Sequence, residues 1–323
     1  MKSCTRRYLL LGLVLVSVQG AVLSADANAS INGEKVDVEV IIAGMQANDA
    51  LLTSCSGTFT IVDRCFSGNC LESLPPVPSG TSQGGSSVPV PRGGPLCLQT
   101  EIFAVIASFP NIRVSHEVRE GSGVGGQLAG TEGEEIWDGN RLYRLSARGE
   151  GRKGVFITTK EYGPGMGMVP FYLALFPWHD PRVESFKKNK VVSLGTEEID
   201  GTTTWVIEWT PVEAEFSDFH VRYWLDPARG CLPLKSEEYT DAQGESPICR
   251  TTYSDLKCYG GLWIPLSGKR DVFDSAGKVG ASSEISTIRL TVNEPVPPDT
   301  FNVALPPGTA IWDDDLGMGR RQL

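Results

Sequence analysis

The chain has 323 residues, of which 41% are hydrophobic and 21% are charged, and it carries a formal net charge of −10. A chain of this length buries enough apolar surface for a large core without disulfides or metals. Its negative charge repels the phosphate backbone, so we do not expect nucleic acid as a partner.

The first 25 residues read as an export signal. Lys2, Arg6 and Arg7 precede the apolar stretch Tyr8–Val18, and small residues at Ala25–Ala29 offer cleavage sites. Removal of residues 1–25 takes away three positive charges and no acid, so the formal charge goes from −10 to −13. We expect a periplasmic or secreted protein, exported by the general secretory or the twin-arginine route. No later stretch predicts a transmembrane helix.

Residues Glu34–Leu52 predict the first helix of the mature chain. Ile41, Met45 and Leu52 recur near helical spacing, and Asn32-Gly33 precedes them as a start signal. A second helix is predicted over Met166–Phe176, which is almost entirely apolar.

The segment of about 67–95 predicts a flexible surface insertion. It is rich in Pro, Gly and Ser, and such a composition buries too little apolar surface to offset its ordering entropy. A cysteine bounds it on each side, at Cys65 and Cys97.

The rest of the chain predicts strands. In the first half they are expected at Thr58–Val62, Leu98–Ala107, Ile112–Arg119, Glu135–Asp138, Arg141–Ser146 and Gly154–Thr159. From Lys190 to Leu305, turns rich in Asp and Gly separate β-branched and aromatic runs with period-2 alternation.

Closely spaced hairpins build an antiparallel meander and leave no room for parallel crossovers. The predicted fold is therefore mainly β, of the α+β type. We expect about nine to twelve strands in a strongly curved antiparallel sheet, or unclosed β-barrel, with two helices covering the concave face. Residues 26–323 are expected to form a single domain.

Two enzyme motifs match by chance. Residues 121–126 satisfy GxGxxG, but no helix is expected to follow, and residues 80–84 satisfy GxSxG inside the low-complexity insertion. The three histidines, His116, His179 and His220, form no zinc motif, and no serine or acid is singled out as their partner. We therefore predict no enzyme, no cofactor and no metal.

Large apolar side chains share one face of two neighbouring predicted strands. Trp205, Ile207 and Trp209 alternate on one strand, and Val221 and Tyr223 alternate on the next. One interpretation is a plain core under the helices. The other is that these five residues line a cavity for an acyl chain, since Trp and Tyr suit a pocket mouth.

Several strings resemble the outer-membrane lipoprotein carriers, the LolA/LolB-like superfamily. They occupy residues 47–52, 56–59, 223–227, 232–234, 259–265 and 301–309, with Asp313 after them. The resemblance spans roughly residues 34–313 and implies an unclosed β-barrel whose concave apolar face is covered by helices. In the carriers, that cavity receives the acyl chains of lipoproteins. No ligand-contact residue of the carriers maps onto a position here.

The sequence therefore predicts an exported, non-catalytic binding or carrier protein for a lipid, an acyl chain or a lipoprotein. One alternative is a structural or partner-binding envelope protein whose half-barrel is filled. A hydrolase with an unrecognised site is the third reading.

Seven cysteines remain after the signal, so at least one thiol is left out of any intramolecular pairing. Cys231 and Cys258 flank the turn at residues 241–244, and a bridge between them is predicted because a hairpin brings such residues together.

Overall fold

Strands dominate the structure. The computed structural model describes residues 36–66, 97–108, 111–123, 132–138, 140–148, 152–158, 186–212, 218–240, 244, 246–305, 309–313 and 318–322. The first elements are helix α1 (Val38–Asp49) and strands β1 (Ser54–Cys65), β2 (Cys97–Ser108), β3 (Asn111–Gly123), β4 (Glu132–Trp137), β5 (Leu142–Arg148) and β6 (Arg152–Thr158). The strands that follow are β7 (Lys190–Ile199), β8 (Thr202–Thr210), β9 (His220–Asp226), β10 (Leu232–Tyr239), β11 (Cys249–Tyr259), β12 (Leu262–Phe273), β13 (Val279–Val292), β14 (Ala310–Asp313) and β15 (Met318–Gln322). Two 3-10 turns, η2 (Pro227–Arg229) and η3 (Pro298–Phe301), interrupt the second half.

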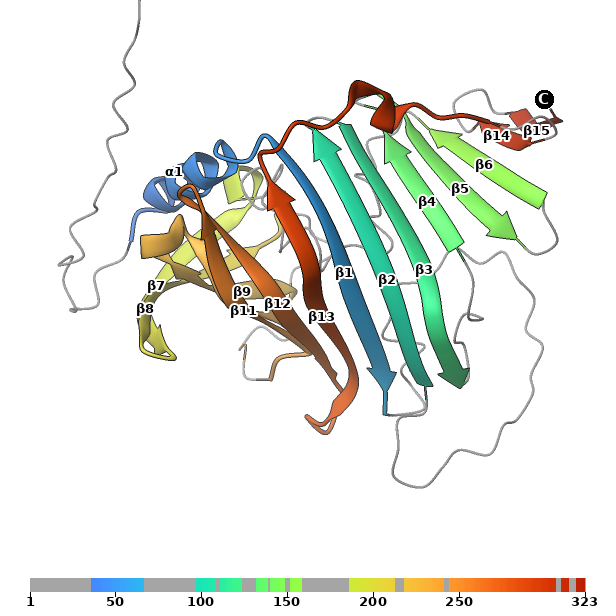
Figure 1. Ribbon diagram of the computed structural model, residues 1–323. Coiled ribbons are helices and arrows are strands. Elements are labelled where there is room, and N and C mark those ends of the chain that lie inside the picture. Colours follow the sequence, from blue (N-terminus) through green and yellow to red (C-terminus); the bar gives the residue numbers. More distant parts are fainter. Residues whose placement is uncertain are drawn as a thin grey trace, which may run out of the picture.

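All fifteen strands belong to one sheet, in the order β15-β14-β6-β5-β4-β3-β2-β1-β13-β12-β11-β10-β9-β8-β7. It consists of two meanders, β1–β6 and β7–β13, which are joined where β1 pairs with β13 (Figure 1). The outermost strands β7 and β15 do not pair with each other, so the sheet is not closed. The predicted antiparallel, unclosed fold is confirmed.

The fifteen strands exceed the expected nine to twelve, and two of them, β14 and β15, lie in the tail beyond the last predicted hairpin. Strand β14 pairs with β6 in parallel, a departure from an otherwise antiparallel sheet. The Pro-rich linker after β13 brings the chain back across the sheet to this edge (Figure 1).

Helix α1 confirms the first predicted helix but begins later than Asn32-Gly33 indicated. Asp37 is the N-cap, and its side chain accepts a hydrogen bond of 3.0 Å from the backbone N–H of Glu39. A carboxylate at this position also suits the positive end of the helix dipole. The helix contacts both β7 and β12, although four strands lie between these two in the sheet. The sheet must therefore curve around α1, which places the helix on the concave side.

The turn chemistry of the second meander follows the prediction. Asp200 and Gly201 join β7 to β8 with φ of 48° and 76°, as a two-residue hairpin with right-handed strand twist requires. The export signal, the insertion at 67–95 and the second helix at Met166–Phe176 lie outside the described residues.

The predicted Cys231–Cys258 bridge is wrong. Both thiols are free, with Cys231 buried against α1 and Cys258 exposed on β11. The prediction assumed that the hairpin continues evenly to both cysteines, but β10 and β11 pair only from Lys235 to Glu238. Near the two cysteines, Cys231 itself and Asp255 have positive φ, which breaks the regular ladder.

The core can be tested with two isoleucines on neighbouring strands. Ile264 on β12 is completely buried, whereas Ile288 on β13 is 62% exposed. We expect Ile264→Ala to cost about 2–5 kcal/mol of stability, through lost apolar contact and the cavity left behind. Ile288→Ala should change stability by about 0.5 kcal/mol or less. Urea unfolding checks both, and equal shifts in the two midpoints would contradict the assignment of the core.

Candidate functional site

One face of the sheet, here called the inner face, carries both hydrophobic clusters. Residues directly opposite each other in antiparallel strands place their side chains on the same face. A chain of such pairs crosses the sheet through Ile207, Tyr223, Ser236, Thr251, Arg270, Ser283, Asp63 and Gln99. Residues two positions along from any member lie on the same side, so the inner face is continuous from β8 to β2.

The larger cluster occupies the inner face of β12, β13, β1, β2 and β3. Its buried members are Leu52, Cys55, Phe59, Ile61, Phe103, Val105, Ala107, Ile112, Val114, Leu262, Ile264 and Ile285. Half-buried Trp137, Tyr253 and Tyr259 pack at its border. Burial raises the pKa of the Cys55 thiol to about 12, so this thiol stays protonated within the cluster.

The second cluster joins α1 to β7, β8 and β9. Its buried members are Ile41, Ile42, Met45, Phe186, Ile207, Leu225 and Cys231. Gly44 permits this close contact, because a Cβ built there would come within 2.8 Å of the Cys231 sulfur.

The structure places all five predicted ligand-binding residues on this inner face, since Ile207 pairs with Tyr223 and Trp209 with Val221. Ile207 and Val221 are buried, while Trp205, Trp209 and Tyr223 are half-buried around the α1 contact. The Phe186 ring meets Tyr223 edge-on, with ring centroids 5.6 Å apart. Their position fits both interpretations of this wall, and their role in ligand binding stays a prediction.

Polar groups occupy the inner face beyond the larger cluster. Ser283 donates a hydrogen bond to Asp63, and Gln99 donates one to Glu101. Glu101 is only 6% exposed, and its Oε2 has no hydrogen-bond partner in the structure. Burial raises the pKa of both carboxyl groups, against the lowering effect of these hydrogen bonds, and the Asp63 charge raises the pKa of Glu101 further.

A second polar group lies on the neighbouring strands of the inner face. Arg270 Nη2 lies 3.2 Å from Glu238 Oε1, and Arg270 Nε donates to Cys249 Sγ at 2.8 Å. Burial raises the pKa of the Cys249 thiol to about 12, and the Glu238 charge acts in the same direction. The inner face is thus apolar near α1 and polar toward the opposite ends of the strands.

Sequence reasoning missed these polar positions. The period-2 alternation of the sequence indicates them, because Asp63 follows Ile61 by two residues and Glu101 precedes Phe103 by two, which places each acid on the same face as its apolar neighbour. An acid in phase with buried residues indicates an inward position.

The outer face carries a charge ladder. Glu208, Arg222, Glu237 and Arg250 lie opposite one another on β8 to β11. Arg222 Nη2 lies 3.0 Å from Glu208 Oε2, and Arg250 Nε lies 2.7 Å from Glu237 Oε1. These ion pairs tie consecutive strands together and leave the ladder largely neutral.

The described histidines lie on opposite faces. His220 stacks on Tyr239 on the outer face at 4.9 Å between ring centroids, and His116 lies 5.6 Å from the Phe103 ring on the inner face. Within the described ranges, no serine or cysteine hydrogen bonds to either ring, and no three His, Cys, Asp or Glu side chains gather as metal ligands. His179 lies outside those ranges.

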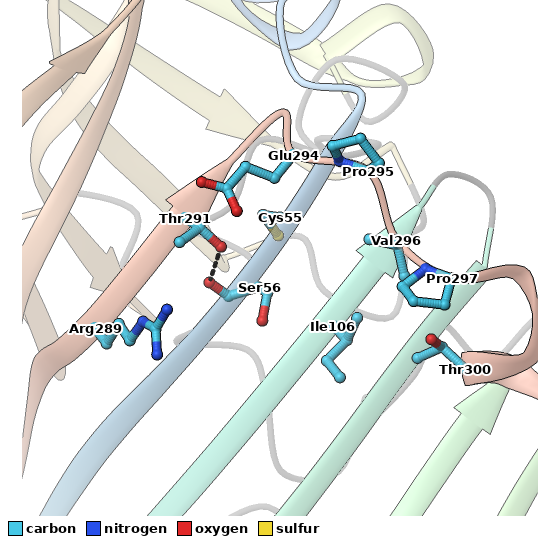
Figure 2. A pocket seen from close by; sticks show the side chains of 10 residues that line it. All are labelled: Cys55, Ser56, Ile106, Arg289, Thr291, Glu294, Pro295, Val296, Pro297 and Thr300. Atoms are coloured by element: carbon cyan, nitrogen blue, oxygen red, sulfur yellow. Dashed lines mark hydrogen bonds between the residues drawn. The ribbon is translucent and has the colours of Figure 1, made fainter.

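A pocket of about 240 Å³ lies between the outer face and the linker that follows β13 (Figure 2). It is lined by Cys55, Ser56, Ile106, Arg289, Thr291, Glu294, Pro295, Val296, Pro297 and Thr300. Ser56 lies opposite both Ile106 and Thr291, out of phase with the buried inner residues. The pocket is too small for a long acyl chain.

Comparisons with known proteins bear on the fold. A family model described as "Uncharacterized protein" matches residues 180–305, which contain β7 to β13. A comparison with curated proteins gives no match. In the described part of the chain, no helix has the length and apolar character needed to cross a membrane.

A comparison with solved structures gives matches of low sequence identity, with TM-scores below 0.5. An outer membrane lipoprotein-sorting domain from Vibrio parahaemolyticus is 16% identical over 81% of this chain and 94% of its own, with a TM-score of 0.44. A LolA superfamily protein from Nitrosomonas europaea is 13% identical over 83% and 98%, with a TM-score of 0.44. A DUF1329 family protein from Desulfovibrio piger is 11% identical over 82% and 97%, with a TM-score of 0.46.

The buried Glu101 carboxyl predicts a pH-dependent stability. Its raised pKa means that the folded state binds the proton more tightly than the unfolded state. The protonated Glu101 carboxyl therefore favours the folded state fully below the ordinary carboxyl pKa of about 4.3. This contribution to stability is lost as the pH rises through the pKa of Glu101 in the folded state. Glu101→Gln removes this loss. We expect the variant to gain about 1 kcal/mol over the wild type at pH 8 and much less at pH 4.

Thermal unfolding at the two pH values measures this difference. Glu198→Gln is the matched control, because Glu198 is an exposed carboxyl on β7. A Glu101→Gln effect that is the same at both pH values would show that the carboxyl does not titrate with folding.

Proposed function

We propose that this is an exported envelope protein that binds or carries a hydrophobic ligand, such as the acyl chain of a lipid or lipoprotein, on its inner face. The observation that carries the proposal is the extent of that face. One apolar cluster spans β12, β13, β1, β2 and β3 of that face, and a second joins α1 to β7, β8 and β9. A face of this size on one sheet is suited to an extended apolar molecule.

The predicted residues supply an entrance beside α1. Half-buried Trp205, Trp209 and Tyr223 each combine an apolar body with a polar tip, which fits the rim of a lipid site. Ile207 and Val221 form the apolar floor beneath them. Burial contributes about 0.8 kcal/mol per CH₂, so a chain of about sixteen carbons binds without any catalytic group.

The division of the inner face orients the ligand. An acyl chain would follow the two clusters, and its polar end would lie toward Asp63, Glu101 and the Arg270–Glu238 pair. An amphiphile matches this layout better than a pure hydrocarbon, because Glu101 Oε2 is buried without a hydrogen-bond partner.

The remaining parts of the proposal concern location and organisation. Residues 1–25 would be removed on export to the periplasm or beyond, and residues 26–323 would act as one non-catalytic domain. The acidic mature chain, of formal charge −13, disfavours nucleic acid as a partner.

A partner-binding envelope protein with a filled half-barrel is the alternative. The observation in its favour is that α1 and Phe186 already occupy the inner face over Ile207, Leu225 and Tyr223. In that case the aromatic residues beside α1 would be plain core, and no acyl chain would enter.

A carboxylate at the rim of the entrance separates the carrier proposal from the partner-binding alternative. We expect Trp209→Glu to weaken binding of a fluorescent fatty acid at least tenfold, because a desolvated carboxylate opposes the acyl chain. Val212→Glu adds the same charge three residues along, at a position that is 69% exposed, and should leave binding unchanged. Fluorescence titration measures both, and near-UV circular dichroism verifies that each variant is folded.

A wild-type protein that binds no acyl probe would contradict the carrier proposal and favour the partner-binding alternative. Equal loss of binding in the two variants would show that added charge, and not this position, is responsible.

A further inference from the structure

Two cysteines lie opposite each other at the base of the insertion. Cys65 is the last residue of β1, Cys97 is the first residue of β2, and the antiparallel register pairs them directly. The same register pairs Asp63 with Gln99 and Ile61 with Glu101, so positions 65 and 97 continue the register of these pairs at the polar end of the two strands.

This register satisfies the distance condition for a disulfide. Directly opposite residues in an antiparallel pair have Cα atoms about 4.5 or 5.5 Å apart, and disulfides span Cα distances of about 4.4–6.8 Å.

The other cysteines of the described ranges have no such partner. Cys55 lies opposite Ala107 and Val292, Cys249 opposite Glu238 and Val272, and Cys258 opposite Trp263. Cys231 is buried against α1. Among the described strands, a cysteine faces a cysteine only at the β1–β2 pair.

We propose that Cys65 and Cys97 are a covalent modification site, joined as a cross-strand disulfide that closes residues 66–96 into a loop. The two thiols lose two protons and two electrons as the sulfur–sulfur bond forms. The electrons reduce a disulfide of an exchange partner, such as oxidised glutathione or a thiol–disulfide oxidoreductase, to two thiols. The inference goes beyond the proposed ligand binding and does not depend on it.

The disulfide would hold together the ends of β1 and β2. It fixes the ends of β1 and β2 next to the buried Asp63 and Glu101 carboxyls, where the inner face is least apolar.

Peptide mapping without reduction tests the bond directly. The purified full-length chain is equilibrated with oxidised and reduced glutathione, its remaining thiols are alkylated, and it is digested with trypsin. Cleavage after Arg64, Arg92 and Arg113 gives peptides 65–92 and 93–113. We expect these two peptides as one cross-linked species, with their separately alkylated forms reduced about tenfold relative to a sample treated with reductant first.

Three single variants identify which cysteines form the cross-link. Cys70 shares peptide 65–92 with Cys65, so Cys70→Ser must keep the cross-link and Cys97→Ser must lose it. Cys258→Ser, at an exposed thiol on β11, is the control and must keep it. The inference is overturned if both peptides remain alkylated after oxidation, or if the cross-link disappears in Cys70→Ser.

Discussion

The pairing of β1 with β13 holds the two meanders together, and the inner face depends on it. Each meander is local in sequence, but this pairing joins residues 55–65 to residues 281–292. Asn293 reinforces it at one end, accepting from the Thr53 N–H at 2.8 Å and donating to the Leu51 carbonyl at 2.7 Å. Ser54 Oγ adds a hydrogen bond of 2.6 Å to the Glu294 carbonyl. Without these contacts each meander would expose an edge strand and half of an apolar face.

The two faces of the joined sheet have different roles. The outer face carries ion pairs in register, such as Arg250 with the buried Glu237, which link neighbouring strands. The inner face concentrates its aliphatic and aromatic residues near α1 and its buried acids toward the far ends of the strands. Curvature around α1 turns that inner face into a concavity, and its apolar-to-polar gradient is what an amphiphilic ligand requires.

Local chemistry made the hairpins and the fold class predictable from sequence. Asp200-Gly201 specifies its turn from two residues, and alternation in β8 and β9 already assigned Trp209 and Tyr223 to one face. Features set by distant strands were not accessible in this way. The partner of Cys65 depends on the register of β1 with β2, and the environment of Glu101 depends on its closeness to Asp63. The parallel pairing of β6 with β14 is likewise a long-range contact, which no local sequence pattern predicts.

The account rests on a ligand that occupies the inner face, and lipid analysis of the native protein tests this most directly. The mature protein, purified without detergent from the cells that make it, would be examined by native mass spectrometry and by extraction into organic solvent. The account predicts a bound species that is released by the solvent and identified as an acyl-chain lipid or lipopeptide. A protein that carries only its own sequence mass, with no extractable lipid, would contradict it.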